Sequence, residues 1–304
     1  SLFTNRKNII IFLLVFFITG CKGKKQLPEF TNKDISHVIT QMSDIMYHDI
    51  TNPPLAARFF SYTCLAGYEV VSQHDTAFKS MHGILNEYPD NKKIDTIQSY
   101  DYHLAALLAM METAKKMQPS GKLMDAYEMK FLDSCKILGF DDEVIENSKK
   151  YAQVISKQIL TYAKEDKYNK ISNLARYTPL GKEGTWYPTP PAFMAAVEPN
   201  FNTVRPFTLD SAAQFKPLPP VAFSNTKSSP FYTLTEAIHK ESKAATQEQI
   251  AIASFWDCNP FAVQDQGHLQ YGFKKISPGA HWLGITGIAC EKANKSFNES
   301  MQIY

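Results

Sequence analysis

The chain has 304 residues, of which 44% are hydrophobic, and this is enough to bury one large core or two smaller ones. Its 32 lysine and arginine residues nearly balance its 30 acidic residues, and its longest basic tract is the four-residue KGKK. Proteins that bind nucleic acids usually carry a basic patch or stripe, so this balance argues against a nucleic acid partner.

The first 20 residues have the pattern of a bacterial export signal. Basic residues precede an apolar run over residues 9–18, which is too short for a membrane-spanning helix of roughly 20 residues. The run ends in small residues before Cys21, and this resembles a lipoprotein cleavage box. We therefore expect a signal peptide over residues 1–20, lipidation of Cys21, a tether over residues 21–33, and attachment to a bacterial membrane of the cell envelope, such as the outer membrane. An uncleaved anchor or a buried first helix is the alternative.

Helical periodicity dominates residues 34–165. Apolar side chains repeat every three or four positions across residues 35–46, and either Thr31 or Asn32 is placed to cap that helix. Two prolines from Pro53 then open a segment that is apolar on nearly all sides, which predicts a buried helix. Further helices are expected over residues 102–117, 122–138 and 142–163. No stretch alternates convincingly with a period of two, so the predicted fold class is all-α, a bundle or bundles of helices.

A proline-rich strap is expected to join two helical regions. Ten of the 17 prolines lie within residues 179–230, and no helix can run through them. The aromatic content is too high for a disordered tail, so we expect residues 166–230 to pack across helices. Helical pattern resumes with a capping box at Thr246, and a last helix is expected to begin near His281. Residues 231–304 would then begin a second helical domain.

The cysteines other than Cys21 are widely separated in the sequence. They form no CxxC motif and no Cys–His pair with zinc spacing, so no metal site is expected. Small core residues are the simpler interpretation, although an export route leaves disulfides open. The four residues are Cys64, Cys135, Cys258 and Cys290. GxGxxG, P-loop, GxSxG and HExxH motifs do not occur in the sequence.

Four segments in the second half of the chain carry a specific resemblance. They are WYPTPP from Trp186, VRPFTLDSAAQFKPLPP from Val204, EQIAIASFWDCNPF from Glu248 and KKISPGAHW from Lys274. Their order and spacing resemble the middle of vanadium-dependent haloperoxidases and of type-2 phosphatidic acid phosphatases (PAP2), in the long helical form of Bacteroidetes-like bacteria. The segment from Met42 to Glu69 also resembles the opening helices of this family, so the likeness extends from about residue 35 to the end.

The resemblance implies a site for vanadate or phosphate. The family holds the oxyanion with a lysine, two arginines, a Ser-Gly-His turn and a final histidine, through charge-assisted hydrogen bonds and an apical imidazole. Here Arg205-Pro206 matches the motif's Arg-Pro, but Glu198 occupies the lysine position. No Ser-Gly-His occurs. We therefore expect Arg205 to make an ion pair or a carbonyl contact instead, and the chain to be truncated before the catalytic motifs, with no catalytic residue and no bound vanadate of its own.

Some residues are candidates for the surroundings of that site. In related haloperoxidases a buried aspartate beyond a Phe-Trp pair steadies an oxyanion-binding arginine, and Asp257 matches it in type and approximate position. The alternative is that Asp257 ends a helix or faces solvent. His268, His281 and Trp282 are candidates for lining the same cleft, although structural histidines are the simpler expectation. The last helix also has an apolar face formed by Trp282, Ile285, Ile288 and Ala289, whose partner helices we expect downstream.

Two functions stay open at this point. The first is a membrane-anchored enzyme of the haloperoxidase and PAP2 superfamily. Its complete form would either hydrolyse a phosphate ester or use vanadate to oxidise a halide with peroxide, because vanadate and phosphate share charge and shape. The second is a non-enzymatic helical surface lipoprotein that binds glycans on Trp186, Tyr187 and Trp282. The resemblance favours the first.

Overall fold

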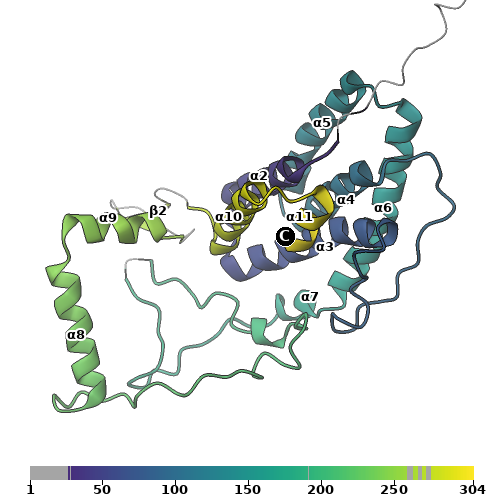
Figure 1. Cartoon of the computed structure of the whole chain (residues 1–304). Helices are drawn as coiled ribbons and strands as arrows, with labels where there is room; N and C mark the ends of the chain where they lie inside the picture. The colour runs from purple at the N-terminus through teal and green to yellow at the C-terminus, as the bar shows by residue number, and fades with distance from the viewer. Residues whose placement is uncertain (1–26, 28, 191, 259–262, 266–268, 272–274) are drawn as a thin grey trace, which may run out of the picture.

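The computed structural model describes residues 27, 29–190, 192–258, 263–265, 269–271 and 275–304. The fold is all-α, as predicted, with one short hairpin (Figure 1). The main bundle is made of helices α2 (Asn32–Asp49), α3 (Pro53–His74), α4 (Tyr102–Met117), α5 (Met124–Leu138) and α6 (Asp142–Lys164). In the described part of the chain no helix is both long enough and apolar enough to cross a membrane.

Helix α4 lies at the centre of the bundle, where it packs against α3 and α6. Its residues Leu104–Met111 are all buried, which accounts for the apolar composition of this segment. Helix α2 begins at a capping box in which the Thr31 hydroxyl and the Asp34 carboxylate accept from each other's backbone amides. The apolar positions that the sequence assigned to one face of this helix are all buried. Helix α3 begins at Asn52, whose side chain accepts from the Leu55 amide.

The strap is less closely packed than its aromatic content predicted. Before residue 230 its described residues form the short helix α7 (Tyr168–Ile171) and the 3-10 turn η2 (Phe201–Thr203), and the rest of what is described there is irregular. Phe207 packs on the core, with its ring centroid 5.2 Å from that of Tyr62. Six other aromatic residues are exposed, so the expectation that the strap packs across helices is wrong for most of its length: Tyr177, Trp186, Tyr187, Phe193, Phe215 and Phe223. Polar contacts hold the strap in place instead.

Two helices stand away from the bundle in Figure 1. Helix α8 (Pro230–Ala244) was not predicted, whereas α9 (Gln247–Trp256) begins at the predicted Thr246 capping box. Neither helix contains a buried residue. An antiparallel hairpin of β1 (Val263–Asp265) and β2 (Leu269–Tyr271) follows, with Gln264 opposite Gln270. No strand was predicted here, because three-residue strands are too short to show a period of two.

The last two helices return to the bundle. Helices α10 (Pro278–Lys292) and α11 (Phe297–Ile303) both pack against α2 and α3. The Asn32 amide donates to the Gly287 carbonyl at 2.9 Å, and the Tyr304 hydroxyl lies 2.7 Å from that of Ser36.

The residues of α10 that are buried are Ala280, Gly287 and Cys290. None of the residues in the predicted apolar face of Trp282, Ile285, Ile288 and Ala289 is buried, so its downstream partner helices stay a prediction. That a second domain begins at residue 231 stays a prediction. Helices α10 and α11 contribute buried residues to the core of the first bundle.

Candidate functional site

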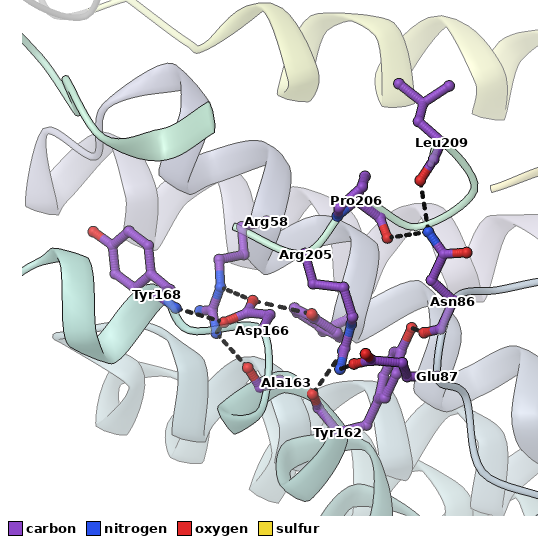
Figure 2. Close-up of polar contacts among 11 residues, drawn as sticks. Arg58, Asn86, Glu87, Tyr162, Ala163, Asp166, Tyr168, Arg205, Pro206 and Leu209 are labelled. Carbon is purple, nitrogen blue, oxygen red and sulfur yellow. Dashed lines mark hydrogen bonds and ion pairs between the residues drawn. The ribbon is translucent and has the colours of Figure 1, made fainter. Parts of the chain in front are cut away.

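Arg205, the residue that matched the Arg-Pro of the oxyanion motif, is part of the contact between strap and bundle (Figure 2). Its Nη2 donates to the Tyr162 carbonyl at 2.8 Å, and its Nη1 lies 3.3 Å from the Glu87 carboxylate. The guanidinium carbon lies 3.7 Å from the ring centroid of Tyr162, and the side chain is 7% exposed. The predicted ion pair and carbonyl contact are thus confirmed. A buried guanidinium engaged in this way does not serve an exchangeable oxyanion.

Beside Arg205 lies a buried ion pair between α3 and the turn after α6. The Asp166 carboxylate accepts from Arg58 Nε at 2.6 Å and from Nη2 at 3.2 Å. It also accepts from the Tyr62 hydroxyl at 3.0 Å and from the Tyr168 amide at 2.9 Å. The side chains of Arg58 and Asp166 are 9% and 1% exposed. Because the Asp166 carbonyl also accepts from the Arg205 amide at 3.0 Å, this pair fixes the strap to the bundle. We call Arg58, Asp166 and Arg205 the strap anchor.

Glu198, which occupies the position of the motif's lysine, is held by two donors. Asn52 Nδ2 and the Tyr168 hydroxyl each donate to its Oε1 at 2.9 Å. Burial, and then the hydrogen bond to Glu198, raise the pKa of Tyr168 to about 12. Burial and the nearby Asp166 carboxylate also raise the pKa of Tyr62. Both tyrosines are therefore neutral donors near pH 7, and Glu198 has a structural role here.

Asp257 ends α9, and its carboxylate pairs with a lysine just before α10. The Lys275 ammonium lies 2.8 Å from Asp257 Oδ2 and donates to the Ser254 carbonyl at 3.2 Å. The Asp257 side chain is 45% exposed and the Lys275 side chain is 27% exposed. The structure therefore places Asp257 at a helix end with a cationic partner, and its role toward an arginine stays a prediction. Cys21 and His268 lie outside the described residues.

His281 lies against the end of α9. Its ring is stacked on the Trp256 indole, with centroids 5.3 Å apart and an angle of 14° between the planes. Its Nδ1 lies 3.4 Å from the Cys258 sulfur. Two of the predicted cleft residues, Asp257 and His281, are thus brought to one junction between α9 and α10. Trp282 is 64% exposed, and Trp186 and Tyr187 are exposed as stacking platforms would be, but no further feature of the described residues indicates glycan binding.

Two clefts of the described structure are large enough for an oxyanion, and the charges of their lining residues decide whether they could bind one. One, of about 230 Å³, lies between α3 and α11, and none of the residues that line it is a lysine, an arginine or a histidine. The other, of about 380 Å³, is lined by three lysines and five acidic residues. The Lys115 ammonium lies 2.6 Å from both Asp125 and Glu128, and Lys136 pairs with Asp142 at 3.0 Å. Among the described residues no cluster of three or more histidine, cysteine or acidic side chains is arranged to hold a metal ion. The first cleft therefore has no cation for a multiply charged oxyanion, and in the second the acidic residues outnumber the lysines.

Arg58 and Asp166 are not among the residues that the sequence pattern indicated as a site. One signal was present, because Arg58 is the only basic residue in the apolar segment LAARFFSYTCLAGYEVV. A charged residue inside a buried helix needs a partner. That partner could not be identified from the sequence, since it lies 108 residues away.

Comparisons with known proteins identify the fold. No protein-family model matches the chain, and a search of curated proteins finds no match. A search of solved structures matches one described as the first bacterial vanadium-dependent iodoperoxidase. The two share 34% sequence identity and superpose with a TM-score of 0.82 over 92% of this chain. The chain spans 66% of the length of that protein. On this likeness in sequence and fold, the chain belongs to the superfamily of vanadium-dependent haloperoxidases and PAP2-like phosphatases.

Proposed function

We propose that this chain forms the helical framework of a haloperoxidase-type enzyme, whose complete form uses vanadate to oxidise a halide, iodide being the first to test, with peroxide. The observation that carries the proposal is the shared fold with the iodoperoxidase at 34% identity over 92% of the chain. Hydrolysis of a phosphate ester is the related alternative, because the same kind of site binds both oxyanions.

The residues described here do not fit vanadate. Arg205 is committed to Glu87 and to the Tyr162 carbonyl, and the neighbouring motif position is the acidic Glu198. We therefore derive no catalytic step from this chain. We propose that the oxyanion-binding residues belong to a part of the gene product beyond residue 304, and that residues 1–304 alone are inactive.

Exposed apolar side chains support a covering domain on the side of α8–α10. They are Leu234 and Ile238 on α8, Ile250, Ile252 and Phe255 on α9, and Trp282 and Ile288 on α10. Large apolar areas of this kind usually mark an interface. About a third of the related iodoperoxidase lies outside the matched part. We propose that the catalytic helices of the same gene product cover this face.

Activity measurements on two proteins test the proposal. We expect the complete gene product to oxidise iodide with peroxide only after orthovanadate is added, and residues 1–304 to show neither this activity nor hydrolysis of a phosphate ester. Phosphatase activity without iodide oxidation in the complete protein would favour the alternative reaction. Halide oxidation by residues 1–304 would show that the assignment of a framework role is wrong.

Asp257 is proposed to orient an arginine of the complete site, in addition to its pairing with Lys275. In the complete protein, Asp257→Asn is expected to weaken vanadate binding by about 2 kcal/mol, at the low end for a buried charged partner because the side chain is half-exposed here. Vanadate affinity should be measured beside Glu248→Gln, an exposed change on the same helix. Equal affinities for the two variants would leave Asp257 as a helix-end residue only.

The lipid anchor also remains a proposal, based on the apolar run before Cys21. A diacyl-type anchor would hold the protein on a bacterial membrane of the cell envelope. In the source bacterium, Cys21→Ser is expected to move the protein from the membrane fraction to the soluble fraction, whereas Cys258→Ser should leave it in the membrane fraction. Fractionation that does not change with Cys21→Ser would refute the anchor.

A further inference from the structure

The junction between α9 and α10 contains a thiol paired with an imidazole. Cys258 Sγ lies 3.4 Å from His281 Nδ1, within hydrogen-bonding range for sulfur. The His281 ring is held by its stacking on Trp256. Cys258 and His281 are both partly exposed, so the pair is in contact with solvent. The sequence did not reveal the pair, because its two members are 23 residues apart.

We infer that Cys258 and His281 form a nucleophile–base pair, and that Cys258 is the site at which this protein reacts selectively with small electrophiles, hydrogen peroxide among them. The imidazole takes the thiol proton on Nδ1 as the sulfur attacks. With peroxide an S–O bond forms and the O–O bond breaks. The departing hydroxide takes the proton from His281 and leaves as water. The sulfur is oxidised by two electrons to a sulfenic acid, and the peroxide is reduced.

The other described cysteines lack this arrangement. Cys64, Cys135 and Cys290 are all buried free thiols. Burial raises the pKa of Cys64 to about 12 and that of Cys135 to about 11, so both thiols stay protonated at neutral pH. Because the thiolate is the nucleophile, these residues should react slowly. The inference does not depend on the proposed oxyanion chemistry, since residues 1–304 contain the whole pair.

The test is a labelling experiment on residues 1–304 with Cys21→Ser, which leaves four thiols. The folded protein is treated with iodoacetamide, and the rate at each cysteine is measured by peptide mass spectrometry. We expect Cys258 to react at least about tenfold faster than each of the other three and faster than N-acetylcysteine. His281→Gln should lower the Cys258 rate by about tenfold. The matched control His239→Gln, an exposed change on α8, should leave it unchanged.

A second readout needs no variant of the pair. After treatment with hydrogen peroxide, dimedone should trap a sulfenic acid at Cys258 and at none of the other three cysteines. If labelling of Cys290 rises in His281→Gln, that variant has unfolded. The inference is then tested by comparing the labelling rate of Cys258, with His281 intact, with the rate of N-acetylcysteine. Equal reactivity of Cys258 and N-acetylcysteine, or a folded His281→Gln variant with the wild-type rate, would overturn the inference.

Discussion

Replacing Asp166 with alanine is expected to lower the free energy of unfolding by about 3–5 kcal/mol, the range for removing one partner of a buried ion pair. The reason is that Arg58, at 9% exposure, keeps its charge but loses both guanidinium contacts with the carboxylate. The Tyr62 hydroxyl and the Tyr168 amide lose their acceptor as well. Urea unfolding followed by circular dichroism measures the change.

Two further variants separate the cost of an unpaired charge from the value of the pair. Arg58→Met combined with Asp166→Leu should recover much of the lost stability, because neither charge is then left buried alone. Glu291→Gln, which removes an exposed partner of Lys33, should change stability by less than about 0.5 kcal/mol. If Asp166→Ala behaved like Glu291→Gln, the strap anchor would not contribute to stability as the structure implies.

Phe297→Ala is expected to destabilise the fold by about 3–5 kcal/mol, as for the loss of a buried aromatic side chain. Phe297 is 4% exposed, and its ring centroid lies 4.5 Å from that of His103 on α4. Next to it the Asn298 side chain donates to Asp75 at 2.8 Å. Removing Phe297 therefore loosens the docking of α11 on the bundle.

The matched control for this change lies on the same short helix. Ile303 is 52% exposed, so Ile303→Ala should cost less than about 1 kcal/mol. Thermal unfolding of the two variants gives the comparison, and limited proteolysis shows whether cleavage begins near residue 294. Equal stabilities would place α11 outside the cooperative core and would support the predicted boundary at residue 231 instead.

Local signals in the sequence were sufficient for much of the bundle. The predicted bounds of α4 match the structure, and the cap at Thr246 is where the sequence places it. The cap of α2 is Thr31, one of the two residues that the sequence offered. The pattern does not predict helix α8, because Pro230 is the last proline of the proline-rich run and so indicates the end of the strap. In the structure this proline is at the first turn of a helix, where it is favourable, and Ser229 provides the N-cap.

The surroundings of the candidate site were much harder to predict. Asp257 was identified, but its pairing with Lys275 depends on how the hairpin returns the chain to α9. The Cys258–His281 contact has the same origin. Helical periodicity predicts which face of a helix is buried, but it does not identify a polar partner on another element. The exposed aromatic residues of the strap show a similar limit. A high aromatic content predicts that these side chains are buried, but it does not identify the element that covers them.

A titration of residues 1–304 with orthovanadate, followed by vanadium-51 NMR, tests the central claim most directly. The chain has the family's helical framework, but the Arg205 of its Arg-Pro pair is engaged by Glu87 and the Tyr162 carbonyl, and Glu198 stands at the lysine position. We therefore predict no saturable binding up to about 1 mM vanadate, under conditions in which the related iodoperoxidase binds as a positive control. Saturable binding by this chain at micromolar vanadate would contradict the account.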